Sequence, residues 1–436
     1  MVSGKSSPAI GLILRPLVLG VALALATPAL ASLPEAGAEP PPRQTWRERL
    51  HEQIHDRHLS LDNPALASAI RLLAHDWDEE SRAILSISNC DDSGPGSLRD
   101  VIDNANSGDT VDMGAMACSV ITLTTGALVV DQQSLRIQGG GAMLFTEDDQ
   151  QLIMHNGDGL LELEDVTLRG GAKYTSDPFI ARGGCIRSSG SVALIDGVAK
   201  YCTARSTGST AARGGAISAV ADVNLINSVI IKNTAQSGTG DASGGGIYAG
   251  GSLLIEGSTV RDNEVITNSS LAHAGMGGGV QGMGDISIIG STISGNQSRQ
   301  AAGVSAAGSA GEHSFYAVNS TIANNQASAS RHGGGMHLAV DGTLRHTTIS
   351  GNVEQLPSGS GKYGGGIAVD GGRHLTMEHT VLSGNLASID GTSFDSDLGR
   401  TGSGTVTFFG WRNLIGFTAP AITVPSHWPR GTDPGL

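Results

Sequence analysis

The chain has 436 residues and 63 of them are glycine, about twice the usual share of roughly 7%. Charged residues make up only 16%, and no strict Gly-X-Y period is present, which excludes collagen and disfavours a disordered chain. The net charge of −14 disfavours nucleic acid as a partner, because phosphate contacts need clustered cations. No apolar stretch of about 18 residues occurs, which excludes a polytopic membrane protein.

Residues 1–31 have the three parts of a secretory signal peptide in the correct order. Lys5 and Arg15 supply the positive end, Leu17–Ala26 is a short apolar run, and Ala29–Ala31 is a small-x-small cleavage site. We therefore expect an exported protein that is extracellular or associated with the outer membrane or cell surface, with the periplasm as an alternative. The mature chain is expected to have no transmembrane segment.

The next two segments differ in composition from the rest of the chain. Residues 32–42 are rich in proline and alanine and are predicted to be a linker, whereas residues 43–82 carry dense charge and little glycine. Asn63-Pro64 is a helix N-cap followed by proline at the first helical position. Apolar residues at helical spacing predict two short helices in 43–82, with Trp46, Leu50 and Ile54 in the first and Leu66, Ile70, Leu73 and Trp77 in the second. His51, His55 and His58 share one side of the first helix, where a solvated polar face is favoured over a metal site.

Two sequence marks recur from about residue 84 onwards. The first is a glycine run followed closely by an aliphatic residue, as in Gly245-Gly246-Ile247. The second is an aliphatic residue three positions before an asparagine, and it gives a column of six residues: Asn233, Asn263, Asn296, Asn325, Asn352 and Asn385. The asparagines are 27 to 33 residues apart. Such a period predicts a repeat architecture.

Within each repeat the apolar residues alternate, as at Val223 and Leu225, which predicts strands with one face buried. No helical period separates these strands, so a parallel sheet of βαβ units is excluded. A coil that climbs one strand spacing per turn joins short parallel strands without helices. We therefore expect an all-β solenoid of about eight to ten coils, each with three short strands and a variable Gly/Ser-rich loop such as Thr234–Ser243.

The asparagine column is predicted to be structural. A coil corner often needs a residue with positive φ, which asparagine tolerates. Stacked asparagine amides can also donate and accept hydrogen bonds along the corner, which satisfies buried polar groups. Cys202 occupies this column in its own coil, and Cys185 occupies the glycine-run position of the same coil.

The four cysteines are predicted to form two disulfides in an oxidising compartment. Three pairings are possible, and no CxxC-type pair suggests a metal site instead. Since Cys185 and Cys202 fall within one coil, we favour a bond between them.

The repeats resemble those of bacterial polymorphic outer membrane proteins, and Arg213–Ile217 (RGGAI) matches the first mark of that family fully. Asp92–Asp100 and Asn106–Thr110 resemble the SLRE-type N-terminal segment of secreted right-handed parallel β-helix proteins of the pectate-lyase-like superfamily. The resemblance implies a right-handed parallel β-helix in which residues 84–130 form the N-terminal cap and first coil and 131–436 form the repeats. It implies a helix near Leu98–Ala105 over the open end. Cys90 and Cys118 bracket this segment, which supports their pairing.

The function is less constrained than the fold, because this fold carries lyases, hydrolases, adhesins and inert stalks. We favour a non-catalytic extended face for adhesion or ligand contact, with an extracellular glycan or a protein surface as partner. No catalytic residue, cofactor or metal ligand is assigned, because the carboxylate and Arg/Lys sets of polygalacturonases and pectate lyases are missing. The sequence leaves the oligomeric state open.

Two alternatives remain. The first is a polysaccharide lyase or hydrolase that acts on an acidic glycan, and its possible binding surface is a basic stripe of Arg169, Lys200, Lys232 and Arg261. Ordinary exposed charge at a turn is the simpler interpretation of this stripe. The second is a structural spacer whose residues 43–82 dock on a partner.

Overall fold

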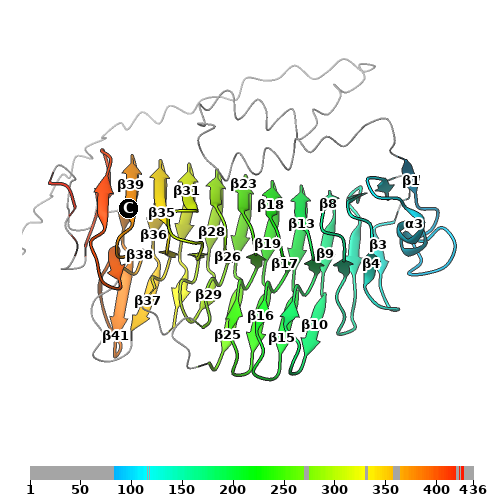
Figure 1. Cartoon of the computed structure of the whole chain (residues 1–436), viewed down its shortest axis with the longest axis horizontal. Coiled ribbons are helices and arrows are strands. Elements are labelled where there is room, and N and C mark those ends of the chain that lie inside the picture. Colours follow the sequence, from blue (N-terminus) through cyan, green and yellow to red (C-terminus); the bar gives the residue numbers. More distant parts are fainter. Residues whose placement is uncertain are drawn as a thin grey trace, which may run out of the picture. The chain divides into compact units, whose positions relative to one another are not determined.

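The computed structural model describes residues 83–114, 116, 118–269, 274–328, 332–356, 364–418, 422 and 424–426. The predicted signal peptide, linker and helical segment of residues 1–82 lie outside the described residues, together with His51, His55 and His58, and stay predictions. The described chain forms a parallel β-solenoid of about eight turns, as the repeats predicted. Strands of successive turns lie side by side along its length (Figure 1).

Three parallel sheets enclose the core. Sheet A contains β1 (Ile84–Ser86), β2 (Thr110–Asp112), β5 (Leu135–Gln138), β8 (Leu160–Glu164), β13 (Ser191–Ile195), β18 (Val223–Ile226), β23 (Leu253–Glu256), β27 (Ile286–Ile289), β31 (Ser314–Val318), β35 (Asp341–Arg345), β39 (His374–Glu378) and β44 (Thr407–Phe409). Sheet B contains β3 (Val120–Thr122), β6 (Met143–Phe145), β9 (Thr167–Arg169), β14 (Val198–Lys200), β19 (Val229–Ile231), β24 (Thr259–Arg261), β28 (Thr292–Ser294), β32 (Thr321–Ala323), β36 (Thr348–Ser350), β40 (Val381–Ser383) and β45 (Leu414–Ile415). Sheet C contains β4 (Leu128–Val130), β7 (Ile153–His155), β12 (Ile186–Ser188), β17 (Ile217–Ala219), β22 (Ile247–Ala249), β26 (Val280–Gly282), β30 (Val304–Ala306), β34 (Met336–Leu338), β38 (Ile367–Asp370) and β43 (Leu398–Thr401).

The inward residues of the three sheets form one hydrophobic core. In β13, Val192 and Leu194 point inward and are fully buried, as the alternation in the sequence predicts. Val192 pairs in register with Val223 of the next turn, so like residues stack in columns along the solenoid. Parallel pairing at one strand spacing, about 4.8 Å, therefore holds each turn on the one before it.

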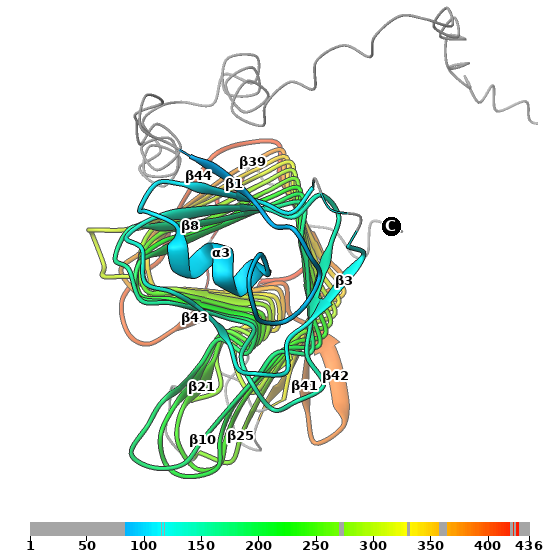
Figure 2. The same cartoon turned by 90° about the vertical axis from the view of Figure 1, so that its right-hand side faces the viewer.

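The variable segment is not a loop, and here the sequence expectation was wrong. It forms two further sheets, which we together call the fin and which project beside sheet C (Figure 2). Sheet D contains β10 (Ala172–Thr175), β15 (Thr203–Ser206), β20 (Thr234–Ser237), β25 (Glu264–Thr267), β29 (Gln297–Ser298), β33 (Gln326–Ala327), β37 (Val353–Leu356), β41 (Leu386–Ile389) and the antiparallel β42 (Thr392–Asp395), and sheet E contains β11 (Ala181–Arg182), β16 (Ala212–Arg213) and β21 (Ala242–Ser243). Small side chains such as Ala204, Ala235 and Ala212 fill a separate core between D and E. Alanine side chains are small, so the two sheets can pack closely. Alanine is also only weakly hydrophobic, and for that reason the sequence pattern did not predict strands here.

The asparagine column forms a continuous buried ladder. Nδ2 of Asn233 donates to Oδ1 of Asn263 at 2.9 Å, and the same bond repeats through Asn296, Asn325 and Asn352 to Asn385. Each Oδ1 also accepts the backbone N–H of the preceding asparagine, at 3.0 to 3.1 Å. The ladder therefore satisfies polar groups that the corner removes from water.

The left-handed backbone at this corner belongs to the residue before each ladder asparagine. Lys232 has φ of 55° and Asp262 has φ of 55°, whereas Asn233 and Asn263 do not have positive φ. The expectation that the ladder asparagine itself adopts positive φ was therefore wrong. The side chain is needed for hydrogen bonding, and the turn is made one residue earlier.

A second ladder was not anticipated. At the corner between sheets A and B, the backbone N–H of Ser228 donates to Oγ of Ser258 at 2.9 Å, and Ser258 donates likewise to Ser291 at 3.0 Å. Ser320 continues the column. Its signal was available in the sequence, because each of these serines lies five residues before a ladder asparagine.

Helix α3 (Leu98–Asn104) lies across the open end of the solenoid, where the resemblance placed a capping helix (Figure 2). Ser97 caps its N-terminus, and Leu98 and Ile102 are buried against the first turns. The Arg99 guanidinium donates to the carbonyls of Gly126 and Ala127, at 2.8 and 2.6 Å. This arginine therefore ties the helix to the chain that follows β3.

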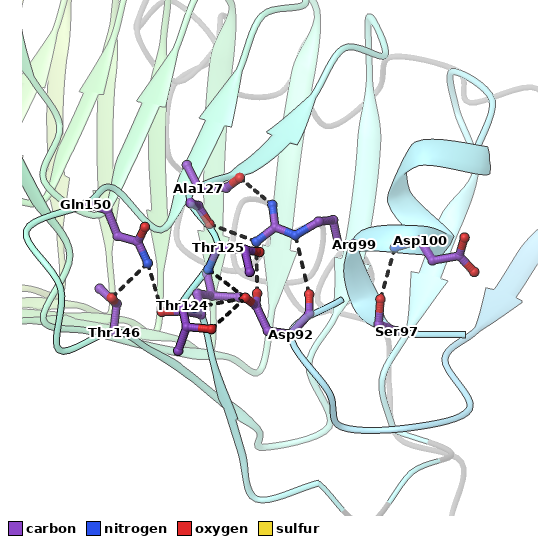
Figure 3. Close-up of polar contacts among 11 residues, drawn as sticks. Asp92, Ser97, Arg99, Asp100, Thr124, Thr125, Ala127, Thr146 and Gln150 are labelled. Carbon is purple, nitrogen blue, oxygen red and sulfur yellow. Dashed lines mark hydrogen bonds and ion pairs between the residues drawn. The ribbon is translucent and has the colours of Figure 1, made fainter. Parts of the chain in front are cut away.

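Asp92 completes the cap. One carboxylate oxygen bonds Arg99 at 2.9 Å, and the other accepts the backbone N–H groups of Thr124 and Thr125 at 2.9 and 2.7 Å (Figure 3). Burial would raise the pKa of Asp92, but these hydrogen bonds hold it well below its ordinary value. The Asp92 carboxylate is therefore an ionised structural group of the cap.

Both disulfides lie in the N-terminal half of the solenoid. Cys90 bonds Cys118, and Cys185 bonds Cys202, which is the pairing that the sequence analysis favoured. Two disulfides indicate an oxidising compartment outside the cytoplasm. Among the described residues no helix has the length and apolarity that a membrane crossing requires.

Candidate functional site

The predicted basic stripe is only partly a column in the structure. Lys200 pairs in register with Arg169 on one side and with Ile231 on the other, and Ile231 pairs with Arg261. Lys232 lies one residue later, in the turn. The position between Lys200 and Arg261, where the stripe was predicted to have Lys232, is therefore occupied by the uncharged Ile231. In this repeat the lysine lies one residue closer to the asparagine column than the cations of the other repeats do.

Two other cations of the stripe, Arg169 and Arg261, already have partners within the protein. The Arg169 guanidinium lies over the ring of Phe145 at 5.2 Å and near the ring of Tyr201 at 6.0 Å. Arg261 forms an exposed ion pair with Asp262 at 2.7 Å, which solvent screens. The structure thus leaves a short aromatic–cation cluster here instead of a continuous basic track.

A cleft of about 580 Å³ opens where the fin begins, and it was not anticipated from the sequence. It lies at β10, the first strand of sheet D, and extends to β11 and β12. Its lining consists of three cations, two aromatic residues and four small or apolar residues: Lys173, Arg182, Arg187, Tyr174, Phe179, Thr175, Ser176, Pro178 and Ile180. None of the described residues that line it carries a carboxylate.

The cleft exists because the fin has an open end. Lys173 pairs in register with Ala204, and Ala204 pairs with Ala235, both of which belong to the small core of the fin. In the first turn of the fin, a lysine thus takes the place that alanine fills in the next two turns. No strand precedes β10 in sheet D, so the lysine stem faces the cleft from the end of this core.

The three cations of the cleft have no carboxylate partner among the residues that the structure describes. Arg187 contacts the sulfur of Met154 at 3.5 Å, and Arg182 stacks in register with Arg213 of the next turn. Burial, together with the charges of Arg213 and Arg187, lowers the pKa of Arg182. Cations gathered in this way repel each other and favour the binding of an anion.

Exposed rings border these cations. Phe179 is 69% exposed and Tyr174 is 41% exposed, so both rings are accessible to a ligand. Outside the cleft, Arg213 of β16 lies 4.9 Å over the ring of Tyr248 of β22. The cleft can therefore offer a flat apolar platform beside several donors of charge-assisted hydrogen bonds.

A second polar group, also missed, lies on sheet C at β34 and β38, away from the cleft. Nε2 of His337 bonds the Asp370 carboxylate at 2.9 Å, and His332 packs edge-on against His337 with ring centroids 4.6 Å apart. Burial would raise the pKa of Asp370, but the hydrogen bonds of His337 and Thr401 and the charge of His337 lower it to about 2. Isolated histidines at irregular positions gave no signal in the sequence.

Within the described part of the chain, no group of three or more His, Cys, Asp or Glu side chains is arranged to hold a metal ion. No protein-family model matches the chain, and comparison with curated proteins finds no match either. The function must therefore be argued from the cleft itself.

Proposed function

We propose that this protein binds an acidic glycan, without cleaving it, in the cleft at the start of the fin. The observation that carries the proposal is the set of Lys173, Arg182 and Arg187 beside the exposed rings of Tyr174 and Phe179. Carboxylates or sulfates of a glycan would bond the cations, and a sugar ring would stack on an aromatic face. The protein as a whole has a net charge of −14, so the positive charge of the cleft is a local feature.

The chemistry of the lining favours binding over hydrolysis. A glycoside hydrolase generally needs two carboxyl groups flanking the bond that it cleaves, and the cleft lining contains none. The predicted signal peptide and the resemblance of the repeats to polymorphic outer membrane proteins support display outside the cell, at the surface or in the medium. A solenoid that presents this cleft on a long rigid body suits adhesion to a polymer.

The test is a titration of the purified full chain with uronic-acid oligosaccharides and, separately, with neutral glucan oligosaccharides. We expect binding of the acidic series alone, with no new reducing or unsaturated ends formed. Lys173→Ala/Arg187→Ala removes two cations of the cleft and should weaken binding at least tenfold, since one charge-assisted bond contributes about 1.5–3 kcal/mol.

Arg169→Ala/Lys200→Ala is the matched control, because it removes the same charge from the predicted stripe. It should leave the affinity within about twofold of wild type. Loss of binding in this control with no change in the cleft variant would move the site to the stripe. Cleavage of the acidic oligosaccharides would instead establish the lyase or hydrolase alternative.

A further inference from the structure

The outward face of sheet A carries an apolar patch that the function proposed above does not use. Ala193 and Ile195 flank the core residue Leu194, so they point to the opposite face of β13. Each of the next four strands places one apolar and one polar residue at its outward positions: Ile226 with Asn224, Leu254 with Glu256, Ile289 with Ser287, and Val318 with Tyr316. The apolar members, which we call the patch, are Ala193, Ile195, Ile226, Leu254, Ile289 and Val318. All six are between 0% and 7% exposed, and none belongs to the core inside the solenoid.

The patch has defined ends. Towards the N-terminal end Arg136 forms an ion pair with Glu162 at 2.9 Å, and towards the C-terminal end Arg345 forms one with Glu378 at 3.0 Å. No helix or strand of the described residues lies over the face between them (Figure 2). A sheet face whose apolar residues are buried together with Asn224, Glu256 and Ser287, and which has charged pairs at both ends, is expected to have a packing partner of limited length.

We propose that residues 63–82 of this chain dock on the patch as an amphipathic helix. The apolar stripe from Leu66 to Trp77 is about 17 Å long at 1.5 Å per residue. The patch from β13 to β31 covers four strand spacings, about 19 Å. Ser68 and His75 fall on the opposite side of such a helix, and Leu72 is the one large apolar residue near them, so its outer face is mainly polar.

The chain can make this connection. The segment continues directly into β1, which is the first strand of sheet A itself, and β13 lies four strand spacings from β1, about 19 Å. The six residues from Asp78 to Ala83 reach up to about 20 Å when extended. Trp77 can therefore reach β13 with Leu66 directed towards β31, which makes this segment a better occupant than a separate partner.

A photo-crosslinking amino acid in place of Leu254 in the full chain tests the proposal. After irradiation, mass spectrometry should find cross-links from position 254 to peptides within residues 63–82. Mixed isotope-labelled and unlabelled protein should show that they are intramolecular. The same probe at Thr376, an outward position of sheet A beyond the patch, should give far fewer such cross-links.

A second experiment disrupts the docking contact by a substitution in the proposed helix. Ile70→Asp should reduce the cross-link at least fivefold and accelerate amide hydrogen exchange in β13 and β18, whereas Ser68→Asp on the polar side should change neither. Cross-links to a second copy or to another protein, or none within 63–82, would overturn the proposal. So would an unchanged cross-link in Ile70→Asp. Glycan binding at the cleft is a separate readout, so the two proposals can fail independently.

Discussion

Asn385 donates both its backbone N–H and its side-chain N–H to the same oxygen of Asp397, at 2.9 and 2.7 Å. In every earlier turn of the ladder, Nδ2 of one asparagine donates a hydrogen bond to Oδ1 of the asparagine in the next turn. Asp397 ends the series because both of its oxygens accept, the second from the backbone of Phe417 at 2.7 Å. Burial raises the pKa of Asp397, while these hydrogen bonds oppose the shift.

Asp397→Asn should destabilise the protein although it is nearly isosteric. The new Nδ2 would face the Phe417 N–H, so one acceptor is lost and two donors meet. We expect a loss of about 1–2 kcal/mol in the free energy of unfolding, measured with urea. Asp395→Asn removes the same charge at an exposed position and should leave stability unchanged or slightly higher. Equal stability of Asp397→Asn and wild type would contradict a requirement for two acceptors.

Asn296→Ala should show how much the ladder contributes. Its Oδ1 accepts two bonds from Asn263, and its Nδ2 donates to Asn325, so several buried groups lose partners together. We expect a loss of roughly 3 kcal/mol, because each unsatisfied buried group costs about 1–3 kcal/mol. The control is Asn156→Ala, which removes one exposed hydrogen bond and should cost under about 1 kcal/mol. If Asn296→Ala loses no more stability than the control, the ladder contributes little to the free energy of unfolding.

Cys202 occupies the ladder position in its turn, and its backbone N–H donates to Oδ1 of Asn233 at 2.9 Å. Cys185→Ala/Cys202→Ala should lose about 3 kcal/mol with the disulfide. Cys185→Ala/Cys202→Asn should recover about 1 kcal/mol of this loss, because the new amide can donate to the ladder. Calorimetry of both variants, with wild type under reducing conditions as reference, measures the difference. Equal melting temperatures of the two variants would show that an asparagine at position 202 does not extend the ladder.

The Asp370–His337 contact should make stability depend on acidity. The folded-state pKa of Asp370 is about 2 and the ordinary value is 3.8. A lowered carboxyl pKa stabilises the fold above the ordinary value, and this contribution is lost as the pH falls from 3.8 towards 2. Asp370→Asn should therefore be less stable than wild type at neutral pH, and the difference should shrink over this range. A difference in melting temperature that stays constant with pH would refute the ion pair.

Binding at the cleft should weaken as salt increases, because the proposed contacts are ionic and partly exposed. Titrations of wild type with uronic-acid oligosaccharides at increasing sodium chloride should give a clear negative slope of log affinity. In Lys173→Ala/Arg187→Ala the residual affinity should depend less on salt. An affinity that is independent of salt in wild type would indicate that the aromatic rings, and not the cations, account for recognition.

The sequence by itself determined the solenoid. Asn263 and Asn296 recur at intervals of one turn, and alternating residues such as Val223 and Leu225 can bury only one face of a strand. Both signals are local and repeat in every turn, so no long-range information was needed to predict stacked parallel strands. The same regularity favoured the pairing of Cys185 with Cys202.

Only the tertiary structure revealed the cleft in which we propose that a ligand binds. Lys173, Arg182 and Arg187 carry no motif, and they line one cleft because the fin folds beside sheet C and begins at β10. The fin itself packs through alanines such as Ala204, whose weak hydrophobicity hides its strands in the sequence. The repeat pattern predicts the features that all turns have in common. The cleft depends instead on one turn, the first of the fin, which differs from the turns that follow it.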